Sequence, residues 1–592
     1  MRSTFLLAAI AVALAGTSVG CQDPNPSDEG KGEAPPVDPN SPEGQNIPSE
    51  GETTSGLEAV DDAIKAWMRA TCTGAVTFAL GFDGKPLTAK GYGHKYGPPN
   101  AACGKGSDVY TNALDVMPET PMRIGSNSKA ITAAIVRIVL KQKLAALGRP
   151  TTDAEVESLP VFDADLDLVS ARFRRAVSSN LATGTAACTA IDGGVSEIVA
   201  GGRVDPRWTS MTVGQLLGHR SGLPRGGNPV TAKLAAIRGI DSLEKLEAES
   251  ALAGATPTTQ SALDEKISGA RFIRQSTLEE YLVGNVDLCL TYPPGGPLPA
   301  ISGFNPYSNM AYGILQHIAE HVSGRTLTAP LGAPGDHPES LLAQFNETRL
   351  GFTKGVRSKY GIYAAQPIIN LRDLAEPSYR GWDGQSLVGK FADVKRPFCV
   401  WNEGTSTCDT SAFTNGSVRY HWQWKNELVD VGYENEGFAA GPGLIVVEAP
   451  LMLKFMAKYW VEGAGSVPLY GRERATSPSA TTRWHLGALR GTDSTVAQFA
   501  GDQVPYFVVP RKDGELDLAT FEKYPADAPP DAQCKLPKGL DMVLTANQHD
   551  DKACAGQSTT VCAYRYMALR DVVKEALCKV SWQKVHPQLA AK

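Results

Sequence analysis

Strand-like segments lie at both ends of this sequence, with helix-like segments between them. Near the N-terminal end, two apolar segments at 75–80 and 86–91 flank Asp83-Gly84, a dipeptide that favours the tight turn of a β-hairpin. Strand-like segments return only late in the chain, at 443–447, 485–489 and 542–546. Sheet at both ends with helices between them predicts an α/β domain that is interrupted by a helical one.

Helical patterns support this division. The main helical segments are predicted at 57–68, 126–144, 307–323 and 565–580. Apolar residues nearly encircle the segment 126–144, which predicts a buried helix.

The boundaries follow from these segments. We expect an α/β part made of 57–147 and 431–592 and a helical part over 148–430. The helical part would carry long insertions, at 148–208, 225–300 and 330–435.

The composition is that of a globular protein, with 42% hydrophobic and 20% charged residues. Lys and Arg number 57 against 63 Asp and Glu, a balance that gives no support to a nucleic-acid binder. The charge is uneven, because residues 22–56 hold eight acidic residues and one lysine. The same stretch is rich in Pro and Gly and lacks aromatic residues, so we expect a disordered linker.

The first 21 residues have the pattern of an export signal. Arg2 precedes an apolar run of twelve residues at 5–16, which is too short to span a bilayer and predicts a signal peptide over 1–20. Small residues then precede Cys21, which resembles the lipidated cysteine of bacterial lipoproteins; an ordinary signal peptide cut nearby is the alternative. We expect an exported protein whose linker, 21–56, tethers it to a membrane lipid, in the bacterial outer membrane or periplasm.

Cysteine usage agrees with export. Ten cysteines follow Cys21, and an even number in an exported protein predicts up to five disulfide bonds. The close pairs Cys399/Cys408 and Cys554/Cys562 are candidates for local loops.

The candidate nucleophile is Ser126, in the tetrad Ser126-Asn127-Ser128-Lys129 at the start of the predicted buried helix. A spacing of three residues puts the hydroxyl and the amine one helical turn apart. A serine hydroxyl needs a base, and a lysine amine becomes one when burial lowers its pKa. Two other Ser-x-x-Lys sequences, at 242–245 and 581–584, have no apolar helix behind them. The alternative for Ser126 is an ordinary helix N-cap.

The residues around this tetrad resemble the class C β-lactamase and DD-peptidase family of serine hydrolases. Residues 122–133 match its nucleophile segment, and further segments match in the expected order at 74–93, 211–223, 307–309, 441–455 and 485–487. The resemblance covers about 57–592. It implies an α/β plus α, β-lactamase/transpeptidase-like fold, in which an antiparallel sheet is flanked by N- and C-terminal helices and interrupted by a helical domain.

The resemblance assigns roles to Tyr307 and Asn309. Tyr307 would lie near Ser126 and Lys129 and share the transfer of the hydroxyl proton, because adjacent cations lower the pKa of a phenol. Asn309 would hydrogen-bond the acyl amide of a substrate and the lysine.

The segment His485-Leu486-Gly487-Ala488 would line the site, where the family has Lys-Thr-Gly or His-x-Gly. The N–H groups of Ser126 and Ala488 would form an oxyanion hole, and Gly487 would let the substrate backbone approach. Leu486 lacks the hydroxyl that helps to hold a substrate carboxylate.

We therefore expect an exported serine hydrolase that acylates Ser126 and needs no metal or other cofactor. Its substrate would be a small molecule or a peptide, with a peptidoglycan-type D-amino peptide or an ester ranked above a β-lactam. A catalytically inactive, lipid-tethered binding protein of the same fold is the alternative. A remote alternative is a zinc protease, because His317, Glu320 and His321 match the inverted His-x-x-Glu-His motif, although we expect these side chains on a solvated face.

Overall fold

The computed structural model describes the following residues: 46–71, 73–94, 115–179, 204–224, 278–300, 304–327, 340–350, 441–443, 445–461, 470–474, 481–489, 492–506, 533–547 and 559–586, with short strands at 363–364, 398–402, 407–409, 418–424, 427–430, 511–512 and 515–516. The predicted signal peptide and Cys21 lie outside this part of the chain.

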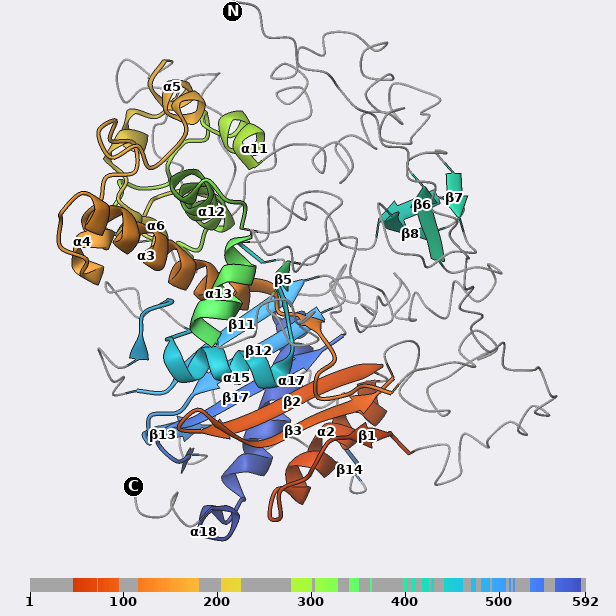
Figure 1. The fold of residues 1–592 in the computed structure, drawn as a ribbon. Coiled ribbons are helices and arrows are strands. Elements are labelled where there is room, and N and C mark those ends of the chain that lie inside the picture. Colours follow the sequence, from red (N-terminus) through yellow and green to blue (C-terminus); the bar gives the residue numbers. More distant parts are fainter. Residues whose placement is uncertain are drawn as a thin grey trace, which may run out of the picture.

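A six-stranded antiparallel sheet forms the centre of the α/β part (Figure 1). Its order is β1-β3-β2-β17-β12-β11, and the strands are β1 (Ser49–Glu50), β3 (Lys85–Gly93), β2 (Ala75–Phe82), β17 (Leu540–Ala546), β12 (Thr492–Gln498) and β11 (Arg483–Leu489). Strand β2, from the N-terminal end, pairs directly with β17, from the C-terminal end. The predicted assembly of strands from both ends into one sheet is confirmed.

The hairpin β2–β3 turns at Asp83-Gly84, as predicted. Asp83 and Gly84 have φ angles of 47° and 79°, the left-handed conformation that a two-residue turn between twisted strands requires.

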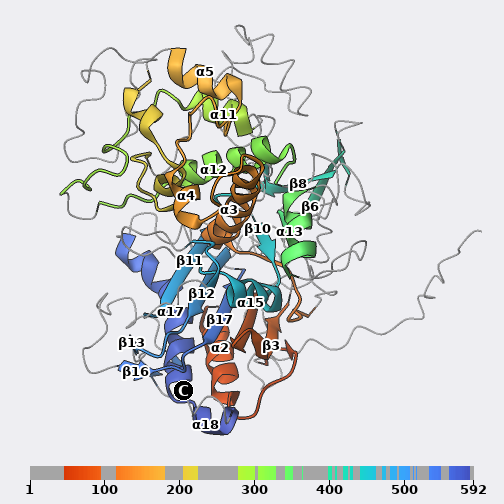
Figure 2. The same ribbon diagram turned by 60° about the vertical axis from the view of Figure 1, so that its left-hand side comes forward.

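Helices cover both faces of the sheet, so every residue of β2 and β17 is buried (Figures 1 and 2). Helices α2 (Glu58–Thr71) and α17 (Thr559–Cys578) pack together on one face, against Val76, Phe78 and Leu80 of β2. Helix α15 (Ala449–Lys458) packs on the other face, where Ala79 belongs to a second core. The alternation of the β2 side chains between two cores follows from the pleat of a strand.

A helical part lies beyond one end of this sheet (Figures 1 and 2). Its helices are α3 (Ser128–Ala146), α4 (Asp153–Ser158), α5 (Ala171–Ser179), α6 (Val213–Leu217), α11 (Leu278–Gly284), α12 (Asn309–Ser323) and α13 (Leu341–Leu350), with the 3₁₀ helix η4 (Pro206–Ser210). Helix α3 packs against α12 and buries residues on nearly every side, which confirms the predicted buried helix.

The smaller elements complete the fold. A three-stranded sheet contains β4 (Met122–Arg123), β10 (Ile445–Val447) and β5 (Tyr363–Ala364). Two-stranded sheets pair β13 (Gln503–Pro505) with β16 (Gln533–Lys535) and β14 (Arg511–Lys512) with β15 (Glu515–Leu516), and helix α18 (Trp582–Val585) follows α17.

The division into parts needs one correction. Residues 398–430, predicted to belong to the helical part, contain a four-stranded antiparallel sheet of β7 (Thr407–Asp409), β6 (Phe398–Asn402), β8 (Val418–Trp424) and β9 (Glu427–Asp430).

The predicted linker also ends earlier than expected. Ile47 is 1% exposed, and Ser49 and Glu50 form the edge strand β1 against β3. Asp61 of α2 accepts hydrogen bonds from Thr53 (2.6 Å) and from the buried Lys90 (2.7 Å), which fixes the segment to the body. The prediction that the chain is disordered up to residue 56 is therefore wrong. An acidic, polar segment can still be ordered by pairing with an open sheet edge.

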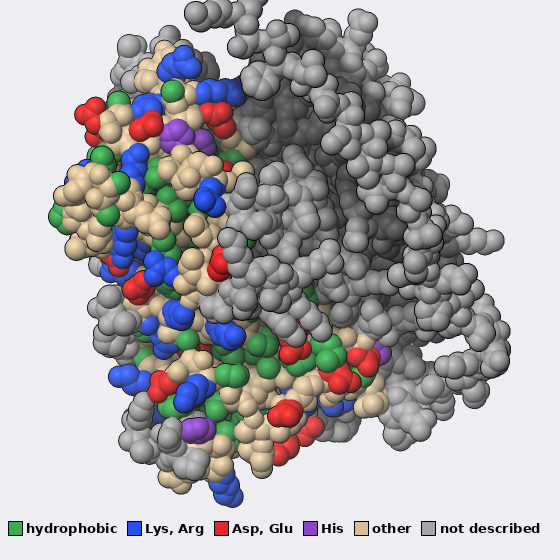
Figure 3. Space-filling view, viewed as in Figure 1, with side chains coloured by type: hydrophobic (Ala, Val, Ile, Leu, Met, Phe, Trp, Pro, Cys, Tyr) green, Lys and Arg blue, Asp and Glu red, His purple; other side chains and the backbone are tan. Residues whose placement is uncertain are grey.

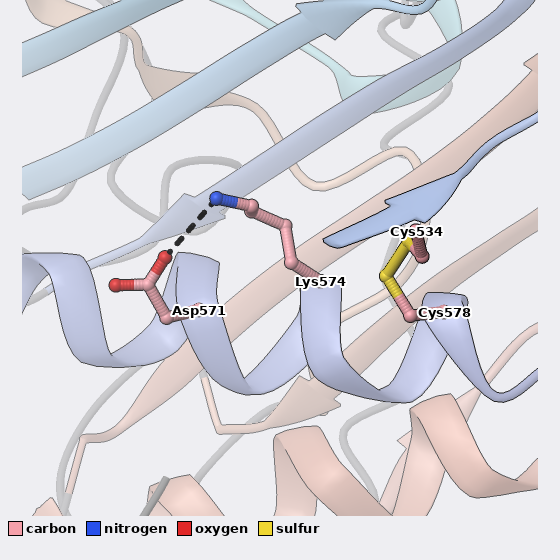
Figure 4. The surroundings of a disulfide bond; sticks show 4 residues. All are labelled: Cys534, Asp571, Lys574 and Cys578. Carbon is pink, nitrogen blue, oxygen red and sulfur yellow. Dashed lines mark hydrogen bonds and ion pairs between the residues drawn. A yellow bond between two sulfur atoms is a disulfide. The ribbon is translucent and has the colours of Figure 1, made fainter. Parts of the chain in front are cut away.

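One disulfide joins Cys534 of β16 to Cys578 at the end of α17 (Figure 4). Cys289 is also disulfide-bonded. The side chains of the predicted pairs Cys399/Cys408 and Cys554/Cys562 lie outside the described residues.

On the face seen in Figure 3, acidic and basic side chains are interspersed over the described residues. Among the helices that the structure describes, none is long and apolar enough to cross a bilayer.

Candidate active site

Ser126 lies in a 3₁₀ turn, η2 (Gly125–Asn127), which connects strand β4 to helix α3. Gly125 enters the turn with φ of 53°, and the Ser128 hydroxyl donates to its carbonyl at 2.6 Å. The N-cap of α3 is Asn127, whose side chain makes no capping bond. The alternative that Ser126 is an ordinary N-cap is therefore wrong, and its half-buried hydroxyl remains available for other contacts.

Lys129 lies on the first turn of α3 and has no exposed surface. Its Nζ is 3.2 Å from the Ser126 hydroxyl and donates to Oδ1 of Asn309 at 2.8 Å and to the carbonyl of Pro442. The tyrosine rings of residues 307 and 312 lie 4.6 and 5.5 Å from this nitrogen. The lysine is thus buried, in contact with two carbonyl oxygens and two aromatic rings.

The Tyr307 hydroxyl donates to the Ser126 hydroxyl oxygen. Tyr307 directly precedes Ser308, the N-cap of α12, whose hydroxyl accepts from the Ala311 amide at 3.2 Å. Because the helix begins after Ser308, Tyr307 lies outside it, in contact with Ser126. Asn309 is the first residue of the helix and is exposed, so it can reach a ligand.

Segment 441–443 supplies the Pro442 carbonyl and is held by two side chains from the helical part. The Gly441 amide donates to Gln316 of α12 at 2.8 Å, and the Thr132 hydroxyl of α3 donates to the Gly441 carbonyl at 3.1 Å. The sequence did not predict a role for Gln316 or Pro442: Gln316 lies outside the matched segments, and Pro442, within 441–455, contributes only a backbone carbonyl.

His485 lies on β11 and is buried beside the turn that carries the serine. Its Nδ1 is 2.8 Å from Oδ1 of Asn127, whose amide nitrogen donates to Ser494 of β12 at 2.6 Å. Burial is the main cause that lowers the pKa of His485 to about 3, so its ring is neutral at physiological pH.

Gly487 allows β11 to approach the nucleophile segment. A Cβ at this position would lie 1.9 Å from the Ile124 carbonyl oxygen and 2.6 Å from the Ser494 hydroxyl. Glycine is therefore needed at this position. The backbone that approaches it on this side is that of Ile124, whereas the prediction named the backbone of a substrate. Leu486 is 44% exposed, and Ala488 follows on the same edge strand.

His219 also belongs to the site, although the sequence predicted no role for it. It follows α6, within the motif at 211–223, and its ring centroid lies 4.5 Å from that of Tyr307. The sequence signal was the motif itself, since it contains the histidine.

Residues 60–333 match the family model described as Beta-lactamase. This part of the chain belongs to the β-lactamase family. The matched part includes Ser126, Lys129, Tyr307 and Asn309 and ends before His485. The family includes serine hydrolases that act on amides, esters and β-lactams.

Solved structures similar to the chain include a β-lactamase/D-alanine carboxypeptidase from Yersinia pestis complexed with citrate, at 12% identity over 88% of this chain and 98% of the other, with a TM-score of 0.36. A D-amino acid amidase from Ochrobactrum anthropi SV3, complexed with L-phenylalanine amide, is 15% identical over 87% of this chain and 98% of the other, with a TM-score of 0.40. No curated protein matches the chain. The antiparallel sheet and its helices have the β-lactamase/transpeptidase-like fold.

The His-x-x-Glu-His sequence of the β-lactamase-family domain does not form a zinc site. His317 is buried and accepts a hydrogen bond from the Ser170 amide at 3.2 Å, while Nε2 of His321 faces Asp167 at 3.4 Å. Glu320 accepts instead from Gln316 (3.0 Å) and the Leu327 amide (2.9 Å). The three side chains have separate partners, so the zinc-protease alternative is wrong, as is the solvated face expected for His317.

The β-lactamase-family domain thus brings Ser126, Lys129, Tyr307 and Asn309 into direct contact and places His485 on the adjoining strand. Such an arrangement can activate a hydroxyl nucleophile, because an amine and a phenol both reach its oxygen.

Proposed function

We propose that this protein is an exported serine hydrolase that acts on esters or amides through an acyl-enzyme at Ser126. The observation that carries the proposal is the contact of one serine hydroxyl with both a fully buried lysine, Lys129, and a phenol, Tyr307. In the first step the Ser126 oxygen bonds to the carbonyl carbon, its proton passes to the lysine–tyrosine pair, and the leaving group departs with a proton. Water then repeats the sequence on the acyl-enzyme and frees the serine.

The surroundings of Lys129 suit a neutral amine. A neutral amine has two N–H groups, which would donate to the oxygens of Asn309 and Pro442. Its lone pair would then face the Ser126 hydroxyl. Burial favours this uncharged form, because transfer of an ammonium out of water is costly.

The developing oxyanion would be held by the main-chain N–H groups of Ser126 and Ala488. The position of β11 supports this assignment, because it is an edge strand that contacts η2 and an edge strand presents backbone N–H groups outside the ladder. One such donor contributes about 2.7–4 kcal/mol in the transition state.

For the substrate, we propose a D-amino peptide derivative or an ester without a free carboxylate at the leaving-group end. His485 is neutral above a pH of about 3, and the neighbouring Leu486 has no hydroxyl. A carboxylate placed against this strand would meet neither a cation nor a hydroxyl from these two residues. A β-lactam, which carries such a carboxylate, ranks lower.

The test is covalent labelling with a fluorophosphonate or a fluorescent penicillin. Wild type should be labelled and Ser126→Ala should not. Ser581→Ala is the matched control, since it removes the serine of the Ser-x-x-Lys sequence at 581–584 and should keep full labelling. Equal labelling of wild type and Ser126→Ala refutes the nucleophile. No labelling of folded wild type favours the inactive binding protein.

A matched pair of substrates tests the specificity. The same D-dipeptide is offered with a C-terminal amide and with a C-terminal carboxylate, beside a p-nitrophenyl ester and nitrocefin. We expect the amide and the ester to be hydrolysed faster, and a preference for the carboxylate would contradict the role given to His485.

Export and lipid attachment at Cys21 belong to the same proposal. The disulfide Cys534–Cys578 supports it, because disulfides persist in oxidising compartments. Metabolic labelling with palmitate should mark wild type and not Cys21→Ser, and fractionation should place wild type with the outer membrane.

A further inference from the structure

His219 combines an uncommon backbone conformation with a buried polar side chain. Its φ of 53° is left-handed, which is uncommon for a residue with a side chain. The ring is buried, and among the described groups its Nε2 has no hydrogen-bond partner. Costs of this kind persist where the residue has a function.

The contacts of His219 lead to the residue that follows Tyr307. Its Nδ1 accepts a hydrogen bond from the Ser308 amide at 3.1 Å. On the N-terminal side of the Tyr307 α-carbon, the Tyr307 amide donates to Oδ1 of Asn305 at 3.0 Å. Two side chains therefore grip the backbone on either side of the Tyr307 α-carbon, before α12 begins.

The His219 ring also supports the phenol directly. The two rings are 4.5 Å apart and inclined by 37°, and Tyr312 lies 5.2 Å away on the same histidine. The loop that carries the histidine is held in turn, because the Tyr292 hydroxyl donates to the His219 carbonyl at 2.8 Å.

We propose that His219 is a positioning residue for Tyr307: its neutral Nδ1 and its ring, together with Asn305, hold the phenol at the Ser126 hydroxyl. This inference rests on the proposed function, in which that phenol moves a proton.

The acceptor role requires that Nδ1 carries no proton. Burial is the main cause that lowers the pKa of His219 well below its usual value. The ring is thus neutral, with its one proton on Nε2, which agrees with donation from the Ser308 amide to Nδ1.

The experiment measures inactivation by a fluorophosphonate, resolved into a limiting rate and a half-saturation concentration, for the full chain and its variants. His219→Gly removes the ring and the acceptor but accepts a left-handed φ. His219→Asn tolerates the same φ and returns an oxygen acceptor near Nδ1. His317→Ala is the matched control, because that histidine, in the middle of α12, also accepts a backbone N–H.

We expect His219→Gly to lower the limiting rate about 100-fold, the effect of misplacing a catalytic group by about 1 Å, with little change in half-saturation. His219→Asn should recover most of the loss. His317→Ala should keep the wild-type limiting rate per folded molecule, even if its melting temperature falls.

Three results would overturn the assignment: a wild-type limiting rate in His219→Gly, a loss that only tracks the folded fraction, or no recovery in His219→Asn. If His219→Gly does not fold, Asn305→Ala tests the second contact that holds the backbone of Tyr307, through a side chain near the surface. An unchanged limiting rate in Asn305→Ala then contradicts the proposal.

Failure of the proposed function is a separate result. If folded wild type is not labelled at Ser126, a crystal structure of His219→Gly decides the positioning alone. Tyr307 should then have left the Ser126 hydroxyl, and an unmoved phenol would overturn the inference.

Discussion

Oδ1 of Asn127 lies 2.8 Å from Nδ1 of His485 and joins the turn that carries Ser126 to the edge strand of the sheet. Since the Asn127 amide nitrogen donates to Ser494, Oδ1 is the acceptor and His485 carries its proton on Nδ1. The residue beside the proposed nucleophile therefore fixes both the position and the tautomer of the histidine.

Asn127→Ala should disturb this junction. It leaves a buried N–H of His485 and a buried hydroxyl of Ser494 with one partner fewer, at about 1–3 kcal/mol for each group left unsatisfied. We expect a lower free energy of unfolding and slower labelling. A double-mutant cycle with Ser494→Ala gives the check, because two independent sites would show additive losses.

Lys129→Met should abolish labelling while the protein stays folded. A general base contributes about 10²–10⁴-fold to the rate, and methionine has a similar length without the amine. Lys574→Met is the matched control, because Lys574 of α17 is also buried, beside Asp571 and far along the chain from the site (Figure 4). Labelling that survives in Lys129→Met, or is lost equally in both variants, would contradict the role of the lysine.

His317 should make the protein less stable in acid. Burial lowers its pKa from 6.5 to about 4, so between these values the unfolded chain binds a proton that the folded one does not. The free energy of unfolding is therefore highest above pH 6.5 and falls as the pH drops towards 4, by up to about 3 kcal/mol from this group. His317→Gln keeps an acceptor for the Ser170 amide, and denaturant unfolding at several pH values should show a flatter acid limb; an unchanged limb would be evidence against the burial.

Glu320, on the next turn of the same helix, should act in the opposite direction. Burial raises the pKa of its carboxyl from 4.5 to about 7, so the folded state binds the extra proton in this window. Its contribution to stability is present below pH 4.5 and is lost as the pH rises through 7. Glu320→Gln keeps an oxygen acceptor for the Leu327 amide, and the same unfolding series should show a gain confined to neutral and alkaline pH.

Gly487→Ala should displace β11 from the nucleophile segment. The new Cβ would lie 1.9 Å from a backbone oxygen, which cannot be relieved by a side-chain rotation. Overpacking of this kind costs about 1–3 kcal/mol or more, and labelling should fall with it. Gly313→Ala in α12 is the control, because its Cβ would meet nothing closer than 3.7 Å. Equal melting temperatures for the two variants would count against the close packing.

The local patterns could be interpreted from the sequence. The Asp83-Gly84 turn, the buried helix behind Lys129 and the spacing from Ser126 to Lys129 each depend on residues a few positions apart. The order of the motifs also placed Tyr307 and Asn309 at the site. One helix boundary differs from the prediction: α3 begins at Ser128, two residues after the predicted start, because residues 125–127 form a 3₁₀ turn.

The sequence by itself determined the chemical groups of the site, since their spacing and order depend only on the chain. Tertiary structure alone decided which partners hold them: His219 on Ser308, 89 residues away, and Asn127 on His485, 358 residues away. It also decided that Ser49 and Glu50 join the sheet and that His317 is buried. A hydrogen bond or a paired strand edge between distant segments leaves no periodic trace in either segment, so only the folded chain reveals it.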